Sequence, residues 1–263
     1  MKPIFHYSGN KSKEAKYIKS LMPPQTQRIV EPFGGSAALS FALEKPAIIG
    51  DVRENNIITL QQFKQHGEEL LLFFTELQQK STEELQELYY YWRDEMYGNN
   101  DPLIMAKRWI IVKNNCYAGL DRVNNKTGKY NISFGFRDKM PWNGTQQHIE
   151  LLKDWQIVLQ DWKDTANLAK QNDFVFFDPP YYNRTSDYGG TYKNEEQIHI
   201  DIRDWMQNSP IPSMIVHIDC ELYQDLYSKM NIETKDYTYV TKTNNSKVQH
   251  LYITNYQTKT SLF

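Results

Sequence analysis

Short runs of apolar residues alternate with amphipathic stretches at both ends of the chain. Near the start, residues 28–33 predict a short strand and residues 47–51 predict a second, buried strand that ends in a carboxylate, and a glycine turn with a helical pattern separates them. In the second half, the pattern predicts strands at residues 156–160, 173–178, 213–219, 237–242 and 250–256, with helices at 162–170, 194–207 and 221–230. This alternation predicts an α/β fold with a doubly wound, mostly parallel sheet.

The middle of the chain interrupts the alternation. Residues 61–97 are helical by pattern, and Ser81 followed by Glu84 forms a capping box within that stretch. A further helix begins near Pro102, and the segment KYNISFGF (129–136) predicts one arm of a β-hairpin. We therefore predict one domain made from residues 1–57 and 159–263, and an inserted, mainly helical domain at residues 58–158 that carries the hairpin.

Composition favours a cytoplasmic protein without a membrane partner. Cys116 and Cys220 are too few for a disulfide framework and lack the spacing of metal ligands, which suits a reducing compartment. The N-terminal segment has no signal-peptide pattern, and no apolar run approaches the roughly 20 residues that a membrane span needs.

Positive charge is concentrated in the middle of the chain. The whole protein has 30 basic and 32 acidic residues, yet residues 106–140 contain eight basic residues and only two acidic ones. Asparagine and tyrosine side chains are interspersed with them, and such a mixture can hold phosphates and read base edges. A solvated basic face explains the charge equally well, so composition leaves both interpretations open.

Three predicted strands end in residues that suit a ligand site. Open parallel sheets bind ligands at the carboxyl ends of their strands. The first strand runs into EPFGGS (31–36), where glycine allows close approach to the backbone. The second ends at Asp51, which can hold a ribose diol or simply cap the next helix. The strand at 173–178 ends in the tetrapeptide DPPY (178–181), which chance should produce in roughly one chain in a thousand of this length.

The tetrapeptide resembles the catalytic motif of amino-group DNA methyltransferases that use S-adenosylmethionine. Three further segments resemble the Dam-type (α-class, D12) DNA adenine methyltransferases: FHYSGNKSK (5–13) resembles the N-terminal motif, VEPFGGSAALS (30–40) the cofactor loop, and YAGLDRVNNKTGKYNISFGFR (117–137) the target-recognition hairpin. The four motifs occur in the α-class order and cover essentially the whole chain. The resemblance implies a class I methyltransferase fold and site-specific methylation of a flipped adenine in duplex DNA.

The resemblance also implies roles at the reaction centre. Asp178 and the Pro179 carbonyl would accept hydrogen bonds from the adenine amine, Pro180 would stiffen the loop, and Tyr181 would stack on the extruded base. The methyl group of a sulfonium is already activated, so this chemistry calls for no metal. Cofactor contacts are expected from Tyr7, Lys11, Phe33, Gly35, Ser36, Asp51, Asp161, Trp162 and Asp178, with Lys11 at the methionine carboxylate, Asp51 at the ribose, and Asp161 and Trp162 at the adenine.

DNA contacts are implied for seven residues of the recognition segment: Tyr117, Leu120, Arg122, Asn124, Lys126, Lys129 and Arg137. Arg122 occupies the position that reaches a base edge in the major groove. Lys126 and Lys129 flank a turn, where a hairpin tip would meet the phosphate backbone.

The chain departs from the family pattern at three positions. Ala37 stands where the cofactor loop usually has its second glycine, Ala118 where Dam-type enzymes often have asparagine, and Ser133 where proline is common. The catalytic tetrapeptide is intact. The departures therefore bear on how the cofactor loop is built and on which DNA sequence is read.

Other functions would use similar elements. A methyltransferase of RNA adenine should lack the duplex-reading hairpin, and one that modifies a protein glutamine would favour asparagine at position 178. A DNA-binding module without catalysis should show damage in the cofactor loop or in the tetrapeptide. His217 has the chemistry of a general base, but a lone histidine in a buried strand is commonly a core residue, and we predict no role for it. The expected partner is double-stranded DNA, and the resemblance also allows a cognate restriction endonuclease.

Overall fold

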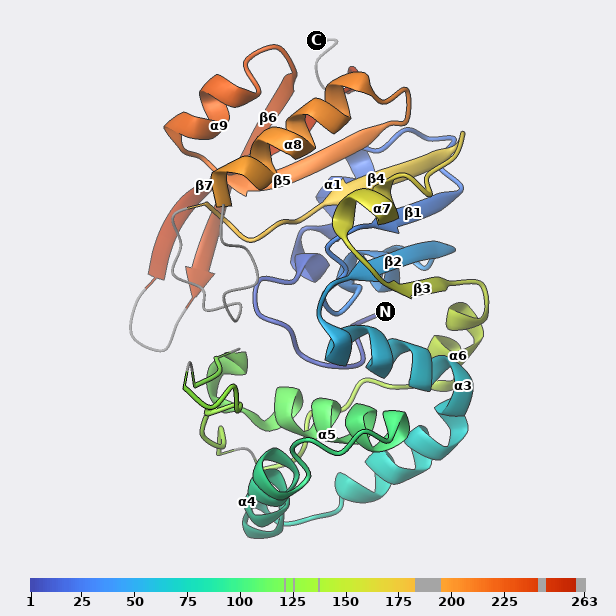
Figure 1. The fold of residues 1–263 in the computed structure, drawn as a ribbon, viewed down its shortest axis with the longest axis vertical. Coiled ribbons are helices and arrows are strands. Elements are labelled where there is room, and N and C mark those ends of the chain that lie inside the picture. Colours follow the sequence, from blue (N-terminus) through green and yellow to red (C-terminus); the bar gives the residue numbers. More distant parts are fainter. Residues whose placement is uncertain (121, 125, 137, 183–194, 241–244, 259–263) are drawn as a thin grey trace.

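The sheet is the centre of the computed structural model, which describes residues 1–120, 122–124, 126–136, 138–182, 195–240 and 245–258. Within these ranges, seven strands pair in the order β3-β2-β1-β4-β5-β7-β6. The first five are parallel to one another: β3 (Gln156–Leu159), β2 (Ala47–Asp51), β1 (Arg28–Glu31), β4 (Asp173–Phe177) and β5 (Ser213–Ile218). β7 (Asn245–Thr254) is antiparallel to both β5 and β6 (Asn231–Val240). The predicted α/β fold with a mostly parallel sheet is confirmed (Figure 1).

Helices cover both faces of the sheet because its central strands are apolar on both sides. Along β4, Phe174 and Phe176 belong to one core cluster, whereas Val175 and Phe177 belong to the other. The first cluster includes residues of α1 (Ala15–Leu21), α2 (Ala38–Leu43) and the start of α3 (Glu54–Leu77), and the second includes residues of α7 (Trp162–Ala166), α8 (Glu195–Asn208) and α9 (Glu221–Leu226). Burial on both faces is what a doubly wound parallel sheet requires.

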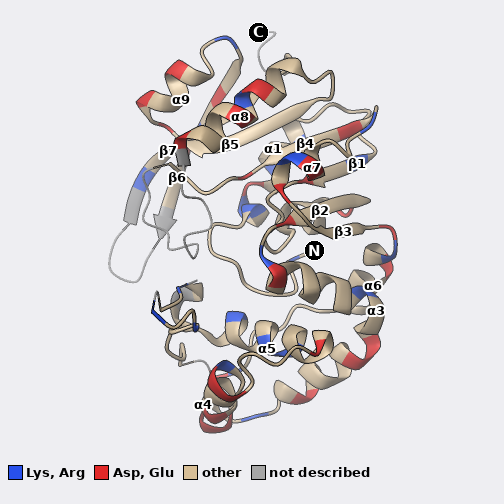
Figure 2. Cartoon of the chain, viewed as in Figure 1, with Lys and Arg blue, Asp and Glu red and all other residues tan. Residues whose placement is uncertain are grey.

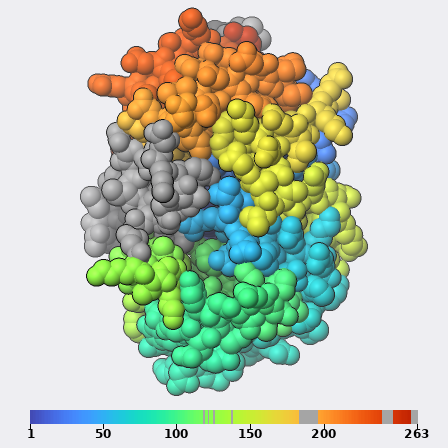
Figure 3. Space-filling model, in the orientation of Figure 1, coloured from blue at the N-terminus to red at the C-terminus, as the bar shows by residue number. Residues whose placement is uncertain are grey.

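A mainly helical part lies at one end of the sheet, where α3 extends away from β2 and β3 (Figure 1). α3 packs along α5 (Pro102–Asn115), next to α4 (Thr82–Tyr90) and a π-helical turn (Tyr91–Glu95), while α6 (Gln146–Lys153) leads back to β3. The predicted capping box of Ser81 and Glu84 is confirmed at the start of α4. Figure 3 shows the side chains of α3 to α5 forming one end of the molecule and those of α8 and α9 the other.

Several element ends differ from the pattern-based prediction. β1 ends at Glu31 because the next residue, Pro32, has no N–H group to donate. The helical stretch predicted at 61–97 is divided, since α3 begins at Glu54, has a non-helical residue at His66 (φ −125°), and ends at Leu77. The predicted domain boundaries after residues 57 and 158 fall inside α3 and β3, and the division into two domains stays a prediction.

The predicted β-hairpin has antiparallel pairing but no strands among its described residues. Val123 bridges Tyr130 and Cys116 bridges Phe134, each as an isolated pair. The carbonyl of Asn124 accepts hydrogen bonds from the Thr127 and Gly128 amides, so the chain turns tightly right after the first bridge.

Candidate active site

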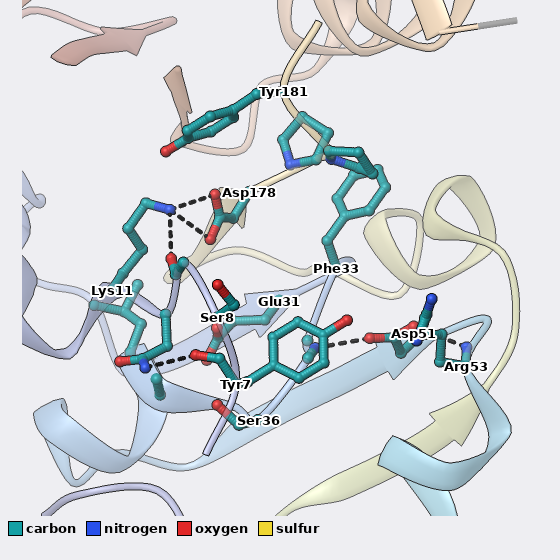
Figure 4. A pocket seen from close by; sticks show the side chains of 18 of the residues that line it. Tyr7, Ser8, Lys11, Glu31, Phe33, Ser36, Asp51, Arg53, Asp178 and Tyr181 are labelled. Carbon is teal, nitrogen blue, oxygen red and sulfur yellow. Dashed lines mark hydrogen bonds and ion pairs between the residues drawn. The ribbon is translucent and has the colours of Figure 1, made fainter. Parts of the chain in front are cut away.

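One pocket opens at the carboxyl ends of β1, β2 and β4 (Figure 4). These strands are neighbours in the sheet, and the loops that follow them line the pocket. Its volume is about 810 Å³ when the open mouth is included. Ten of the residues predicted for catalysis or cofactor binding line it: Tyr7, Lys11, Phe33, Gly35, Ser36, Asp51, Asp178, Pro179, Pro180 and Tyr181. The segments that carry them are far apart in sequence and meet because parallel strands end at the same edge of the sheet.

The glycine turn after β1 is held very close to its neighbours. A Cβ atom on Gly34 would lie 2.4 Å from Ile49 Cγ2, and one on Gly35 would lie 3.2 Å from the Tyr7 ring. Gly35 (φ +51°) and Ala37 (φ +53°) both have left-handed backbone conformations, which favour glycine. Ala37 therefore occupies a position whose geometry suits the glycine found in the family pattern.

Asp51 ties this turn to the start of α3. Its Oδ2 accepts hydrogen bonds from the Gly35 amide (2.7 Å) and from Asn56 Nδ2 (3.2 Å), and its Oδ1 accepts one from the Arg53 amide (2.8 Å). Burial raises the pKa of Asp51, and these hydrogen bonds oppose that rise. Asp51 thus braces the loop and the helix start, while its carboxylate still faces the pocket (Figure 4).

A second carboxylate of the pocket, Glu31, was not predicted as a site residue. It is the last residue of β1, it is buried, and it accepts hydrogen bonds from the Ser40 amide (2.9 Å) and from the Ser40 hydroxyl. Burial raises its pKa to about 7, although the Ser40 hydrogen bonds oppose the shift. The sequence signal was present, since Glu31 directly precedes Pro32 and the glycine turn.

Lys11 and Asp178 form an ion pair at the centre of the pocket. Lys11 Nζ lies 2.6 Å and 2.8 Å from the two carboxylate oxygens of Asp178, and 3.0 Å from the Gly9 carbonyl (Figure 4). Burial alone would lower the pKa of Lys11, but the acidic groups of Asp178, Tyr181 and Glu14 together outweigh it and hold that pKa well above its usual value. Burial raises the pKa of Asp178, and Lys11 opposes that rise. An ammonium group has three N–H donors, so these contacts occupy all of them.

Tyr181 lies above this ion pair. Its ring centroid is 5.2 Å from Lys11 Nζ and 4.8 Å from the centroid of the His217 ring. Figure 4 shows the Tyr181 ring above Asp178, and both prolines of the tetrapeptide line the pocket with them. The tetrapeptide therefore presents a carboxylate and an aromatic face to the same space.

Asp161 and Trp162 are outside the pocket lining. Asp161 is exposed and caps α7 by accepting a hydrogen bond from the Lys163 amide (2.9 Å). Trp162 is buried in the second core cluster, where it stacks on Phe33 with a centroid distance of 6.2 Å and an interplanar angle of 17°. Trp162 thus packs against Phe33, which lines the pocket, and neither Asp161 nor Trp162 lines the pocket itself.

The recognition segment is fixed to the end of α5 and to the N-terminal segment that lines the pocket. The Tyr117 amide donates to the Ser133 carbonyl (2.8 Å), and the Gly135 amide donates to the Asn115 carbonyl (2.8 Å). The His6 amide donates to Asn114 Oδ1 (2.8 Å). These bonds hold the segment beside the pocket rather than apart from it.

The side chains predicted to contact DNA lie at the surface of this segment. Tyr117, Leu120, Arg122, Asn124, Lys126 and Lys129 are exposed, and Arg137 lies outside the described residues. Arg122 Nε donates to Asn131 Oδ1 (3.1 Å), which orients the guanidinium. Asn124 Oδ1 accepts from the Lys126 and Thr127 amides, so this side chain shapes the turn.

The basic window divides into structural and surface cations. Lys113 is fully buried among the rings of Tyr7, Trp109 and Tyr130, and Arg108 is buried against Tyr97. Lys107 pairs with Glu69 at 2.7 Å. The exposed cations, Arg122, Lys126 and Lys129, come later in the chain. They belong to the loop that Figure 2 shows beside the end of α5.

Phe136 is a surface residue of this segment that the sequence did not single out. Its side chain is 74% exposed, and its backbone is left-handed (φ +46°), which is unusual for a bulky residue. It packs edge-on against Phe134, whose bridge to Cys116 places it near the exposed Tyr117. Sequence alone cannot distinguish such a ring from a core phenylalanine.

The family model described as "D12 class N6 adenine-specific DNA methyltransferase" matches residues 7–241, which is most of the chain. The protein belongs to this family. It is an adenine-specific DNA methyltransferase, as the resemblance of its motifs predicted.

Individual relatives of the methyltransferase are similar along most of their length. Type II methyltransferase M.MjaIII of Methanocaldococcus jannaschii is 28% identical, covering 76% of this chain and 78% of the relative. Type II methyltransferase M1.LlaDCHI of Lactococcus lactis subsp. cremoris is 26% identical, covering 97% and 96%. The DNA adenine methylase of Escherichia coli K12 is 24% identical, covering 80% and 78%.

Among the described residues, no three His, Cys, Asp or Glu side chains gather in a way that could hold a metal ion, and Cys116 and Cys220 are not disulfide-bonded. No helix in the described part of the chain combines the length and apolar character that crossing a membrane requires.

Proposed function

We propose that the methyltransferase binds S-adenosylmethionine in the pocket and methylates the exocyclic amine of an adenine that has left the duplex. One observation carries this proposal: the glycine turn, Asp51 and the tetrapeptide DPPY line a single pocket although they are distant in sequence. Methyltransferases of this family normally use S-adenosylmethionine, which supplies a methyl group already activated as a sulfonium. Action on cellular DNA would take place in the cytoplasm.

The polar groups of the pocket fit this cofactor. Ser36 Oγ is buried and has no hydrogen-bond partner among the described residues, so a bound ligand can satisfy it. Asp51 Oδ1 accepts one hydrogen bond and retains the capacity to accept another from a ribose hydroxyl. Phe33 offers an apolar face, and Trp162 would contribute to adenine binding by packing behind it. Asp161 would act only through the cap that it provides to α7.

The tetrapeptide would activate the amine by accepting its hydrogen bonds. The lone pair of the adenine amine is delocalised into the ring, and acceptors placed at its N–H groups localise that pair on nitrogen. Asp178 and the Pro179 carbonyl would be these acceptors. Lys11 uses two of the lone pairs of the carboxylate and leaves others for the amine. Tyr181 would stack on the base, a contact worth roughly 1–3 kcal/mol.

DNA recognition would fall to the exposed side chains at 117–136, within the proposed insertion of residues 58–158. Arg122 would read a base edge, Lys126 and Lys129 would contact phosphates, and Tyr117 and Leu120 would supply apolar contacts to bases. Their exposure beside the pocket supports this assignment. A cognate restriction endonuclease is a further partner, because two of the relatives are named type II methyltransferases.

The decisive experiment measures methyl transfer and cofactor binding separately. Asp178→Ala should reduce transfer from labelled S-adenosylmethionine to duplex DNA by about 10²–10³-fold or more, because an acceptor for the amine is lost. Calorimetry should still detect cofactor binding, and Asp154→Ala, at an exposed acid beyond α6, should retain full activity. Normal transfer by Asp178→Ala, or methyl groups found elsewhere than on adenine N6, would overturn the proposal.

A further inference from the structure

His217 is a buried histidine in the wall of the active site. It lies near the end of β5, directly beside β4, and only 2% of its surface is exposed. The chain leaving β4 forms the tetrapeptide and then passes over the His217 ring. The histidine is thus in contact with the catalytic loop without lining the pocket.

Both ring nitrogens of His217 make backbone hydrogen bonds. Nδ1 lies 2.6 Å from the Ile218 carbonyl, which can only accept, so Nδ1 carries the proton. Nε2 lies 2.9 Å from the Tyr182 amide nitrogen, which can only donate, so Nε2 is the acceptor. This pair of bonds defines a single neutral tautomer of the ring.

Aromatic rings from two helices hold His217 in this orientation. Tyr223 of α9 stacks on it with a centroid distance of 3.8 Å and an interplanar angle of 13°. His199 of α8 packs edge-on at 5.5 Å, and the Tyr223 hydroxyl hydrogen-bonds to His199 Nδ1 at 2.6 Å. All three side chains are buried, so the ring has little freedom to turn.

The cluster formed by His217, Tyr223 and His199 also borders the catalytic tetrapeptide at Tyr181 and at Pro180. The Tyr181 ring is tilted against His217 with centroids 4.8 Å apart. His199 Nε2 is buried without a hydrogen-bond partner among the described residues. Burial lowers the pKa of His199 to about 4, and the nearby Pro180 carbonyl opposes that shift. The cluster therefore borders the loop at Pro180, Tyr181 and Tyr182.

A role for His217 as a general base is excluded by this geometry. Its accepting nitrogen is occupied by the Tyr182 amide, and burial lowers its pKa to about 3. A group that remains neutral and has no available lone pair can position other groups but cannot remove a proton from the substrate.

We propose that His217 is a positioning residue which, through its hydrogen bond to the Tyr182 amide and its contact with the Tyr181 ring, holds the catalytic tetrapeptide in its active conformation. The proposal rests on the assignment of the tetrapeptide to methyl transfer. A shift of the loop would misplace the acceptors of the amine and the ring that stacks on the base. Small misplacements of reacting groups are costly for rate while they leave ground-state binding less affected.

The first test compares two variants of His217. His217→Leu removes the acceptor, whereas His217→Gln can place a carbonyl oxygen near the position of Nε2. In single-turnover assays with saturating DNA and cofactor, we expect His217→Leu to slow methyl transfer by about 10- to 100-fold and His217→Gln to retain most of the rate. Cofactor affinity measured by calorimetry should be unchanged in both variants.

A matched control separates positioning from general loss of stability. His148 is equally buried and also hydrogen-bonded through both nitrogens, to Thr145 Oγ1 (2.8 Å) and to the Lys2 carbonyl (2.9 Å), but it is not part of the pocket. His148→Leu should lower the melting temperature and keep the transfer rate. A wild-type rate in His217→Leu, or equal losses in His217→Leu, His217→Gln and His148→Leu, would overturn the proposal.

A measurement on the unmodified protein keeps the proposal testable if His217→Leu does not fold. ¹⁵N-histidine NMR distinguishes the two neutral tautomers, and His217 should carry its proton on Nδ1, with a strongly protected Tyr182 amide in hydrogen exchange. A proton on Nε2, or rapid exchange of the Tyr182 amide, would show that the bond does not hold the loop. Because these readouts do not involve methyl transfer, their failure is distinct from failure of the proposed function.

Discussion

Replacement of Lys11 by methionine tests what its ammonium group does. The sequence resemblance assigns Lys11 to the carboxylate of the cofactor, whereas in the structure its donors go to Asp178 and Gly9. The two roles predict different defects. If Lys11 serves Asp178, its loss raises the pKa of Asp178, because burial then acts on that carboxyl without the opposing charge.

The magnitude follows from the contact distances. Two unit charges about 3 Å apart attract by about 5–6 kcal/mol at an effective dielectric constant of 20. Much of that attraction offsets the cost of removing both groups from water, so the ionised form of Asp178 should lose about 1.4–4 kcal/mol when Lys11 is replaced. The carboxyl then becomes protonated over a wider pH range, and a protonated oxygen no longer accepts as well from the amine.

The assay is the single-turnover rate of methyl transfer measured from about pH 5.5 to about pH 9 at saturating cofactor. We expect the acidic limb of the Lys11→Met profile to move to higher pH, so that the rate recovers on the alkaline side. Lys11 and Lys13 both belong to a single 3₁₀ turn, Lys11–Lys13, and Lys13 is exposed. Lys13→Met therefore removes a charge from the same turn and should leave the profile unchanged.

Two results would refute this reasoning. An acidic limb at the wild-type position would mean that Lys11 does not support the ionised form of Asp178. Weaker cofactor binding at every pH, with an unchanged profile once the cofactor is saturating, would instead favour the role at the cofactor carboxylate.

Four other predictions concern the pocket and the recognition segment. Asp51→Ala should weaken cofactor binding by roughly 1.5–3 kcal/mol, and unchanged affinity in calorimetry would mean that Asp51 only braces the loop. The pKa of Glu31 is raised from 4.5 to about 7, so protonated Glu31 stabilises the folded state. This contribution to the free energy of unfolding is about 3 kcal/mol. It is complete below about pH 4.5 and is lost as the pH rises through about 7. Denaturant unfolding of Glu31→Gln should lack that pH dependence. Arg122→Ala should relax preference at one base pair by roughly 1–3 kcal/mol in a randomised-site library, whereas Lys126→Ala should weaken binding to all sequences and reduce the salt slope by about one phosphate contact. Phe136→Ala should change the free energy of unfolding by less than about 0.5 kcal/mol because the ring is exposed, yet weaken DNA binding if the ring contacts bases, which titration at two salt concentrations can measure.

Local patterns in the sequence contained most of the fold and the main outline of the candidate site. Apolar runs ending in Asp51 and Asp178 predicted two strands whose carboxyl ends carry acidic groups, and both are present. These features are readable from sequence because burial, turn formation and capping depend on residues within a few positions of one another. The resemblance of four motifs to those of the family, together with their order, was sufficient to identify it.

Partners between distant segments could be found only in the tertiary structure. Lys11 and Asp178 are 167 residues apart, and nothing in either motif indicates that their charges meet. Whether Lys113 is a surface cation or a buried one depends on the rings of Tyr7 and Tyr130, which two other segments place near it in addition to Trp109 of its own helix.

The same limit explains the two residues that the sequence undervalued. His217 could not be separated from an ordinary core histidine, because its role depends on the Tyr182 amide that passes over it from the neighbouring strand. Phe136 resembles Phe134 in its local pattern, yet one ring is exposed and the other is buried. Amino-acid type specifies what a side chain can do, but the order in which strands pair in the sheet decides which chemical groups it meets.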